Sequence, residues 1–556
     1  MANWFVNEGP KYVVLFLWMG INVLLFTLTY IQFDTEKRYI YLKELLKGKG
    51  LPVARGAAMV LNFNCMLILL PVCRNLISLV RSKCTCLPQN ILRLLDKNIT
   101  FHRVCAYMIA IATAIHVGAH MFNVENFVTS WQSTDKLVST LNSESGDNFV
   151  NPIRNPDGDS VTEAIQTVAG VSGVIITMCL IIMVSSSTEL IRRSYFEVFW
   201  FTHHLFIVFF IGLIIHGVQG IIHSQTNIED HDPEVCKDKD WAATPACQKK
   251  PLFGAAGPQT WKWVVGPLAL YLLERCLRFY RSTQNVEISK VVKHPSKVLE
   301  IQMKKPGFHA EPGQYIFLHC PNISNLEWHP FTLTSCPEED FFSLHIRLVG
   351  DWTGALAKAC DTTDVSSIPR VAVDGPFGTA STDVFNYPVC VCVGAGIGVT
   401  PFASILKSIW YKYQSSSPDL KVTKVYFFWI CPDTNAFEWF TDLLQSLETQ
   451  MEEKNLQGFL EYHIYLTRGW DNDQARNIAM HQGSQRDVIT GLQQKMNFGR
   501  PNWAQIFKGI ADNHPRTDIG VFFCGPAVLS HTLHKMSNMH NDDKTGTKFY
   551  YNKENF

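Results

Sequence analysis

Six long apolar runs dominate the first half of the chain. They lie near residues 11–32, 57–80, 103–122, 166–186, 199–219 and 260–279. About 20 apolar residues cross the hydrocarbon core of a membrane as a helix, so the pattern predicts a six-helix transmembrane domain over residues 1–285. Six spans put both chain ends on one side. Basic residues after the second, fourth and sixth runs favour the cytoplasm for that side, although the first loop is also basic.

The pattern changes after Arg281, where apolar and polar residues alternate in short runs. Alternation with a period of two is typical of strands, and we therefore predict a small antiparallel β-barrel over residues 286–387. From residue 388, strands alternate with helical stretches, which predicts an α/β nucleotide-binding domain over residues 388–556. The expected strands are Val286–Val291, Val298–Met303, Tyr315–His319, Val389–Val393, Val425–Ile430, His463–Leu466 and Gly520–Cys524.

Composition narrows the function without defining it. The 556 residues carry 49 basic and 49 acidic side chains, so the formal net charge is zero, which gives no support for nucleic-acid binding. None of the 16 cysteines belongs to a CxxC pair, which argues against zinc or iron–sulfur binding. Cys236 and Cys247 fall in the predicted outer loop after the fifth run, where oxidising conditions favour a disulfide between them.

Four histidines lie within two of the apolar runs. His102 and His116 are 14 residues apart, and His203 and His216 are 13 apart, so each pair spans about 20 Å along its helix. A lone buried histidine is more often structural, but four at matched spacing favour a function. Haem iron takes axial imidazoles, so two such helices side by side predict two stacked haems. Since 13 residues do not return to the same helical face, the second helix must deviate or the haem planes must differ.

Charged residues near these runs are candidate partners for the haems and for oxygen. Arg55, Arg74 and Arg193 are candidates for pairing with anionic haem propionates, although interfacial anchoring explains each of them equally well. His120 lies one turn beyond His116 and could orient oxygen or supply a proton. Because two axial histidines fill each iron, we expect oxygen to be reduced at the haem edge, with Arg55 or His120 as an electrostatic helper.

Two parts of the second half carry groups suited to a flavin and a nucleotide. The segments His329–Ser335 and His345–Thr353 combine aromatic rings, hydroxyls and an arginine, which suit a flavin and its pyrophosphate. Plain strands with polar edges remain the alternative. The turn Gly394–Pro401 follows an expected strand and precedes the helical stretch Phe402–Trp410. Glycines at such a turn let backbone amides approach a phosphate at the helix N-terminus.

The chain resembles a known family, the catalytic subunits of the phagocyte-type, superoxide-generating NADPH oxidases, which are flavocytochromes b. The resemblance extends from Asn3-Trp4 to the terminal segment Asn552–Phe556. Its most specific segments are Leu61–Asn75, Arg192–Trp200, His329–Thr332 and Gly394–Pro401. It implies a multi-domain membrane protein, in which a six-helix transmembrane bis-haem bundle is joined to a cytosolic ferredoxin-NADP-reductase-like unit.

The resemblance also implies roles for individual residues. It implies that His102 and His203 hold the inner haem, and that His116 and His216 hold the outer haem. Around FAD it implies His329, Pro330, Phe331, Thr332, Thr334, Arg347 and Thr353. Near the NADPH pyrophosphate it implies Gly394, Gly396, Gly398, Thr400 and Pro401. It places Cys524 near the nicotinamide, Arg500 at the adenosine end and Phe556 against the flavin.

Two positions depart from the family pattern. Pro432 stands where the family often has an arginine that helps to bind the 2′-phosphate of NADPH, and Arg468 is a candidate replacement. Preference for NADPH over NADH is therefore less firmly indicated than nucleotide binding itself. Ala112 stands where several close relatives have a histidine, so a proton route through that position is not expected.

These features predict an enzyme that moves electrons from cytosolic NADPH through FAD and two haems b to outside oxygen, forming superoxide. A ferric-chelate reductase would share this route but deliver electrons to a metal, and superoxide formed without any chelate distinguishes the two. A non-catalytic membrane scaffold or proton conductor would show no bound haem whose spectrum changes when NADPH is added.

The resemblance further implies partners. It implies a small membrane partner subunit, together with cytosolic organiser and activator proteins and a Rac-type GTPase. We expect an integral protein of the plasma membrane with both termini in the cytoplasm.

Overall fold

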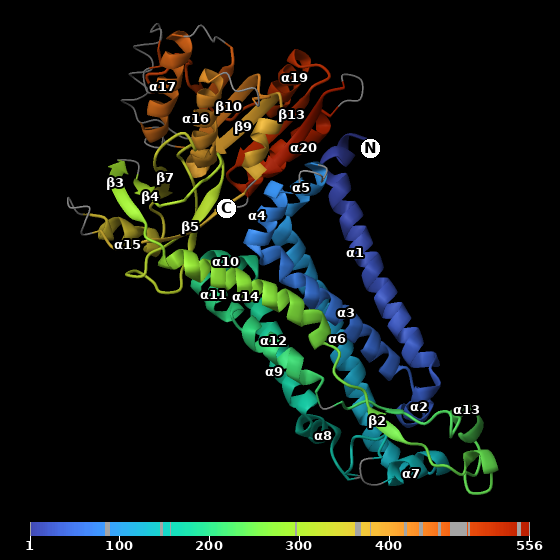
Figure 1. Ribbon diagram of the computed structural model, residues 1–556. Helices are drawn as coiled ribbons and strands as arrows, with labels where there is room; N and C mark the ends of the chain where they lie inside the picture. Colours follow the sequence, from blue (N-terminus) through green and yellow to red (C-terminus); the bar gives the residue numbers. More distant parts are fainter. Residues whose placement is uncertain are drawn as a thin grey trace. The chain divides into compact units, whose positions relative to one another are not determined.

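The structure is a computed structural model in which the chain divides into two compact units (Figure 1). It describes residues 2–83, 89–144, 148–155, 157–218, 220–294, 297–361, 368–378, 380–415, 420–432, 438–453, 458–467, 486–487, 490–541 and 546–554. One unit, called here the membrane unit, holds residues 14–73 and 97–273. The other, called here the reductase unit, holds residues 1–13, 74–96 and 274–556.

Long apolar helices build the membrane unit. They are α1 (Ala2–Thr35), α3 (Gly50–Ile68), α6 (Asn98–Thr129), α9 (Val168–Ser186), α11 (Phe196–His203), α12 (Phe206–His216) and α14 (Trp261–Thr283). Among the described residues, five helical segments are long and apolar enough to cross a membrane. The sixth expected span forms α14, which falls short of the same criteria. Its second half carries Glu274, Arg275, Arg278 and Arg281, which lower its hydropathy.

The second span differs from the prediction, because it lies at Gly50–Val72 and not at 57–80. Helix α3 contains Pro52 in its first turn, where a proline costs no intrahelical hydrogen bond. Pro71 then ends the span in a 3₁₀ turn, and a separate helix α4 (Arg74–Lys83) follows. The apolar run was therefore a poor guide to both ends of this helix.

A buried polar contact joins two of these helices. The indole Nε1 of Trp18 in α1 donates to Asn64 Oδ1 in α3 at 3.1 Å, and Asn64 Nδ2 donates to Asn22 Oδ1 at 2.5 Å. All three side chains are buried. In a setting where water cannot satisfy these groups, the contact fixes how α1 packs on α3.

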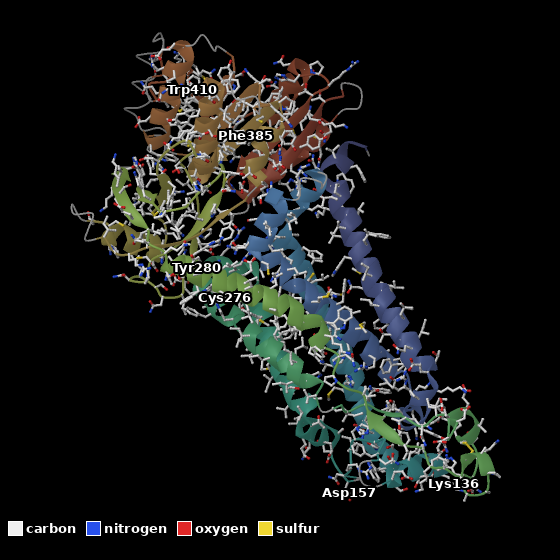
Figure 2. The ribbon with its side chains drawn as sticks, viewed as in Figure 1. Lys136, Asp157, Cys276, Tyr280, Phe385 and Trp410 are labelled. Carbon is white, nitrogen blue, oxygen red and sulfur yellow. A yellow bond between two sulfur atoms is a disulfide. The ribbon has the colours of Figure 1, made fainter. Side chains whose placement is uncertain are left out.

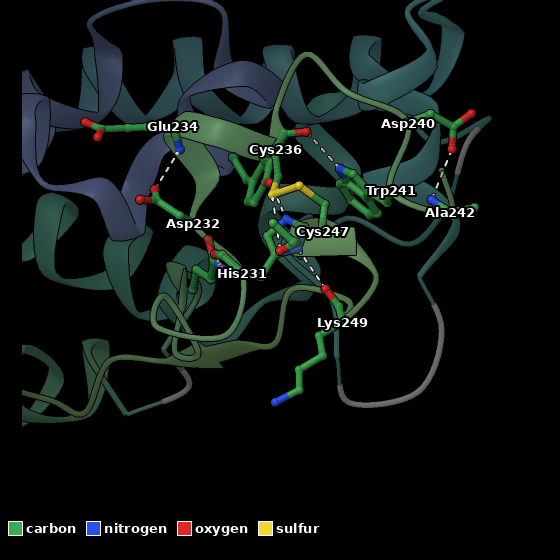
Figure 3. Close-up of a disulfide and its surroundings, with 12 residues drawn as sticks. His231, Asp232, Glu234, Cys236, Asp240, Trp241, Ala242, Cys247 and Lys249 are labelled. Atoms are coloured by element: carbon green, nitrogen blue, oxygen red, sulfur yellow. Dashed lines mark hydrogen bonds between the residues drawn. A yellow bond between two sulfur atoms is a disulfide. The ribbon is translucent and has the colours of Figure 1, made fainter. Parts of the chain in front are cut away.

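The segments between the spans form a small packed layer of their own. Its elements are α2 (Ile40–Leu46), α7 (Lys136–Ser143), α8 (Ser160–Gln166), α13 (Pro233–Cys236) and the two-stranded sheet of β1 (His223–Gln225) and β2 (Phe253–Ala255). The short helix α10 (Glu189–Ser194) lies outside this layer, next to α11 (Figure 1). Cys236 and Cys247 form the expected disulfide, which is confirmed (Figure 3). The indole of Trp241 donates to the Cys236 carbonyl beside it at 3.0 Å.

Two antiparallel sheets form the barrel expected in the reductase unit. One has the order β3 (Glu287–His294), β4 (Val298–Lys304) and β7 (Phe342–Arg347); the other has β6 (His329–Thr332), β5 (Tyr315–His319) and β8 (Ala372–Phe377). Alternate residues such as Leu299, Ile301 and Leu344 point into a common core. Helix α15 (Asp351–Ala359) contributes Trp352 and Leu356 to the same core.

The α/β domain is a six-stranded parallel sheet with helices on both faces. Its strand order is β12 (Asn497–Phe498), β11 (Leu460–Leu466), β10 (Lys424–Cys431), β9 (Val389–Ala395), β13 (Asp518–Cys524) and β14 (Lys548–Lys553). Helices α16 (Thr400–Gln414) and α17 (Glu438–Glu453) cover one face, where Trp410 and Phe385 join the core (Figure 2). Helices α19 (Trp503–Asn513) and α20 (Ala527–Met539) cover the other. The predicted strands and the helix after β9 are confirmed.

The N-terminal residues of the reductase unit cover the edge of this sheet. The Asn7 carboxamide donates to the Phe549 carbonyl at 3.0 Å and accepts from the Tyr551 amide at 2.9 Å. Arg93, in α5 (Gln89–Leu95), donates to the Tyr551 carbonyl at 2.8 Å. Both side chains thereby occupy hydrogen-bonding positions on the edge strand β14.

The basic end of α14 is fixed by a buried carboxylate. Asp374 in β8 is almost fully buried and accepts from Arg278 at 2.7 Å and from Arg281 at 2.9 Å. Glu274 accepts from the backbone amides of Asn75 and Leu76, which begin helix α4. These charges therefore hold residues 274–281 of α14 and the start of α4 against the barrel within the reductase unit.

Candidate electron-transfer site

Two pairs of facing imidazoles lie in the membrane unit. His102 and His203 form the first pair, and their ring centres are 6.2 Å apart. His116 and His216 form the second pair, at the same 6.2 Å. Helix α6 supplies one member of each pair, and α11 and α12 supply the others. The helix breaks at His204, between α11 and α12, which provides the deviation that the 13-residue spacing demands.

Each imidazole uses its Nδ1 atom for a hydrogen bond to the protein. His102 bonds to the Ile68 carbonyl at 2.8 Å, and His116 bonds to the Ala54 carbonyl at 3.0 Å. A carbonyl can only accept, so Nδ1 carries the hydrogen in both rings. The Nε2 lone pair of each ring is then available to a metal, as is usual for ligating histidines.

Two serines, one within α9 and one at its C-terminal end, form hydrogen bonds with Nδ1 of the partner histidines. Neither serine was predicted from the sequence. Ser172 Oγ lies 3.0 Å from His216 Nδ1, and Ser187 Oγ lies 3.4 Å from His203 Nδ1. Each hydroxyl donates to a helix carbonyl at 2.6 Å, so it accepts from the imidazole. Hydroxyls spaced along a strongly apolar helix were the available signal, because polar groups there usually have a partner.

The spacing of both pairs fits a haem between two axial imidazoles. A metal–imidazole bond of about 2 Å, plus roughly 1.1 Å from the bonded nitrogen to the ring centre, puts opposed ring centres about 6 Å apart. The observed 6.2 Å agrees with this value in both pairs. The residues present therefore suit two bis-histidine haems.

The expected charged helpers differ in their surroundings. The Arg55 guanidinium lies 4.9 Å from the ring centre of Phe33, and its buried Nε has no hydrogen-bond partner among the described residues. The His120 ring contacts the His116 ring edge-on, at 4.6 Å between centres. Both residues therefore lie in the membrane unit, and His120 lies beside the second pair.

The two expected propionate partners have other contacts in the structure. Arg74 belongs to the reductase unit and stacks on the Phe317 ring at 4.1 Å. Arg193 is exposed and pairs with Glu189 at 2.7 Å. Neither contact tests the expected propionate role, which stays a prediction.

The expected flavin residues gather around β6 and the N-terminus of α15. The His329 ring lies 4.2 Å from the Trp352 ring, and Phe331 faces the same indole at 6.1 Å. Pro330 and Thr332 belong to the same strand, while Arg347 ends β7 and is exposed. The Thr353 hydroxyl accepts from the Val349 and Gly350 amides and thereby shapes the turn into α15.

Thr334 is engaged inside the barrel. Its hydroxyl bonds to the Ser343 carbonyl at 3.1 Å and to His345 Nδ1 at 2.8 Å. Burial lowers the pKa of His345 to about 3, so this imidazole is neutral at physiological pH. The geometry shows Thr334 as a support for His345.

The expected nucleotide residues lie at one edge of the parallel sheet. Gly394 is the penultimate residue of β9, Gly396 has a φ of +56°, and Thr400 and Pro401 begin α16. In this parallel sheet β10, β11 and β12 lie on one side of β9, and β13 and β14 lie on the other. The strand order therefore switches between β9 and β13, and ligands bind at such switch points.

Gly398 and Cys524 meet at this switch point. A Cβ atom on Gly398 would lie 2.3 Å from the Cys524 carbonyl oxygen, so only glycine allows the turn after β9 to approach the end of β13. Cys524 ends β13 and is buried, and burial raises the pKa of its thiol well above the ordinary value. The thiol is therefore neutral.

The remaining candidates for nucleotide binding follow other strands at the carboxyl end of the sheet, or lie outside the described residues. Arg500 is exposed after Gly499, whose amide donates to the Leu466 carbonyl at 2.9 Å. Pro432 is exposed after β10. Arg468 and Phe556 lie outside the described residues.

Comparisons with known proteins agree with this architecture. Family models match the chain as a ferric reductase like transmembrane component at residues 55–214, an FAD-binding domain at 283–381 and a ferric reductase NAD binding domain at 387–538. NADPH oxidase 3 of Homo sapiens is 50% identical over 572 residues, covering 100% of both chains. The chain belongs to the NADPH oxidase family. NADPH oxidase 1 of Mus musculus is 49% identical over 566 residues, covering 100% of this chain and 95% of that one.

Family membership defines the reaction class. As an NADPH oxidase, the chain is an integral membrane oxidoreductase that moves electrons from NADPH across a membrane to oxygen and forms superoxide. Its cofactors are FAD and haem, with NADPH as co-substrate.

Proposed function

We propose that the two histidine pairs hold the two haems through which this oxidase passes electrons. His102 and His203 would hold the inner haem, and His116 and His216 the outer haem. The 6.2 Å spacing of both pairs supports this assignment. The hydrogen bonds at Nδ1 support it further, because they fix each ring and leave Nε2 for iron. When bound, FAD supplies hydride acceptance and single-electron release, and the haems supply one-electron conduction.

We assign the flavin and nucleotide to the reductase unit. Residues 1–285, 286–387 and 388–556 are the proposed haem, FAD and NADPH domains. The proposed FAD residues are His329, Pro330, Phe331, Thr332, Thr334, Arg347 and Thr353, with Phe556 against the flavin. The proposed NADPH residues are Gly394, Gly396, Gly398, Thr400, Pro401, Arg468, Arg500 and Cys524. The close approach of Gly398 to Cys524 supports a nucleotide lying across the switch point.

Oxygen reduction is assigned to the region of the second histidine pair. Arg55 would provide positive charge for the developing superoxide anion, since its buried Nε has no hydrogen-bond partner among the described residues. His120 would orient oxygen or deliver a proton from its place beside His116. Arg74 and Arg193 are the proposed propionate partners.

Orientation and partners complete the proposal. Both termini would lie in the cytoplasm, and the membrane would be the plasma membrane. The proposed partners are a small membrane subunit, cytosolic organiser and activator proteins, and a Rac-type GTPase. The disulfide between Cys236 and Cys247 supports an oxidising environment for that loop.

Reconstitution tests the function directly. Purified protein loaded with haem and FAD, with and without the proposed partners, should form superoxide from NADPH in the absence of any iron chelate. Two haem irons per polypeptide are expected. Reduction of a chelate without superoxide would instead support a ferric-chelate reductase.

Nucleotide preference is tested separately. The proposed role of Arg468 at the 2′-phosphate predicts a higher kcat/KM for NADPH than for NADH, even with Pro432 after β10. Equal values for the two nucleotides would contradict the role of Arg468 while leaving nucleotide binding intact.

A further inference from the structure

Three side chains with metal-binding atoms converge on the FAD barrel. His294 lies in β3, Glu300 in β4 and His345 in β7, and these strands are neighbours in one sheet. Glu300 pairs directly with Val292 and with His345. Since side chains alternate between the faces of a strand, His294 lies on the same face as Val292. The sheet register thus places all three side chains on one face.

Their ligating atoms are already close together. Glu300 Oε2 lies 3.2 Å from His294 Nε2 and 3.7 Å from His345 Nε2. One ligand atom from each residue lies within 4.8 Å of the others. Tetrahedral zinc with bonds of about 2.0–2.1 Å needs its ligand atoms about 3.4 Å apart. Small side-chain rotations therefore suffice, without movement of the strands.

Hydrogen bonds around the cluster orient the imidazole of His345 toward the carboxylate of Glu300. The Thr334 hydroxyl donates to the Ser343 carbonyl, so it accepts from His345 Nδ1 at 2.8 Å. Nε2 of His345 is then a lone pair that faces the carboxylate oxygen of Glu300. Two acceptors that face each other need a donor or a cation beside them. In the structure His294 Nε2 forms a hydrogen bond with Glu300 Oε2, and a bound cation would replace that hydrogen.

The carboxylate and the second ring are positioned as well. Gln302 Nε2 donates to Glu300 Oε1 at 2.8 Å, and Glu300 Oε2 faces both imidazoles, with a hydrogen bond to His294 Nε2 at 3.2 Å. The His345 ring stacks on Trp439 with its centre 4.0 Å away, which limits its rotation. Such outer contacts are typical of metal ligands.

We propose that His294, Glu300 and His345 bind a divalent cation of the zinc class. Two imidazoles and one carboxylate are a known zinc donor set, with a fourth position for water. Imidazole nitrogen disfavours calcium and magnesium, which prefer oxygen ligands. The side chains are 17%, 16% and 11% exposed, so an ion can enter from solvent. The bound ion would link three strands of the barrel and is independent of the haem irons.

The chain contains a matched control for an ordinary histidine–glutamate hydrogen bond. His463 Nε2 lies 3.1 Å from Glu461 Oε1 on β11, but no third ligand joins them among the described groups that could hold a metal. A pair of this kind should not retain zinc. His463→Gln therefore tests whether any loss of zinc is specific to the three-residue cluster.

The experiment uses the full-length holoenzyme, stripped with a chelator and dialysed against micromolar Zn²⁺. Zinc, iron and flavin are counted per polypeptide. We expect His294→Gln to lose one zinc per chain relative to the unsubstituted protein, with at least a tenfold weaker zinc affinity and unchanged iron and flavin. His463→Gln should keep that zinc. Zinc X-ray absorption should show two imidazoles and oxygen.

A second variant keeps the proposal testable if His294→Gln fails to fold. Glu300→Gln keeps the side-chain volume and should also lose the zinc. If the unsubstituted protein retains no zinc, or if either cluster variant folds and retains as much zinc as the unsubstituted protein, the proposal is overturned.

Discussion

The two histidine pairs have the same spacing but different surroundings. In the first pair, Ser187 caps the end of α9 and lies 3.4 Å from His203 Nδ1. In the second pair, Ser172 lies inside α9 and is 3.0 Å from His216 Nδ1. Within the part of the chain that the structure describes, only the second pair has a further imidazole, His120, against one of its rings. The same arrangement of two facing imidazoles thus occurs twice, with an additional imidazole beside one of the two pairs.

This difference suggests a division of roles. The first pair has the contacts needed to fix two rings, which suffices for electron conduction. The second pair adds a titratable group, as a reaction with oxygen and protons requires. We therefore propose that the first pair only conducts electrons and that the second pair also delivers them to oxygen, and the following changes test that proposal.

Removing one ligand from each pair should give the largest effect. His116→Leu and His102→Leu should each lose one haem and abolish superoxide. With His116→Leu the remaining haem should still be reduced by NADPH, whereas with His102→Leu it should not, because the proposed electron path runs from the flavin to the inner haem and only then to the outer haem. Absorbance at the Soret band, with NADPH and then dithionite, measures this.

A neighbouring histidine provides the control for these losses. His204 Nδ1 donates to the Trp200 carbonyl at 2.7 Å and faces no partner ring across the bundle in the described structure. His204→Gln should keep both haems. Superoxide formation by His116→Leu with an unchanged haem spectrum would refute the ligand assignment.

Blocking electron entry should affect both pairs equally. In Gly398→Ala the new Cβ would collide with the Cys524 backbone, so NADPH should reduce neither haem, while dithionite still reduces both. Gly509→Ala is the control, because nothing lies within 4 Å of its Cβ position. Stopped-flow haem reduction provides the measurement, and normal reduction in Gly398→Ala would contradict the switch-point site.

Arg55→Met should affect only the step after the second pair. Loss of one buried charge near a developing anion typically lowers a rate by at least about tenfold. We expect superoxide formation to fall while haem content and haem reduction stay unchanged. Arg38→Met is the control, since Arg38 also lies over a ring, that of Tyr39, but is exposed. Equal activities in both variants would remove Arg55 from oxygen chemistry.

The serine substitutions should give the smallest effects and distinguish the pairs most finely. Loss of such an outer contact typically weakens metal binding by about 10–100-fold. Ser172→Ala, which removes the 3.0 Å contact, should weaken haem retention more than Ser187→Ala, which removes the 3.4 Å contact. Redox titration and haem loss to apomyoglobin measure this. The reverse order would show that contact length does not govern ligand support.

The sequence predicted what depends on periodicity and local spacing. The strands β5 and β9 were predicted because their residues alternate or are uniformly apolar, and the glycine turn lies where expected. The C-terminal end of the second span was missed because Pro71 ends it within the apolar run. Ser172 and Ser187 were missed because their role depends on a neighbouring helix.

Other parts of the site required three-dimensional contacts. The approach of Gly398 to the Cys524 backbone joins residues more than a hundred positions apart, and no local pattern encodes it. The hydroxyl of Thr334, an expected flavin residue, bonds to His345 and Ser343, and no sequence pattern indicated these two partners. Residue type indicates which interactions a side chain can form, whereas packing decides which partner it forms them with.

The carboxamide of Asn7 has a consequence for how the reductase sheet ends. An open strand edge is a template on which another polypeptide can add, and β14 is such an edge. Asn7 satisfies one carbonyl and one amide of that edge, as a further strand would. A chain lacking this residue would expose two unsatisfied backbone groups, and its most accessible route to satisfying them would be association with a second molecule.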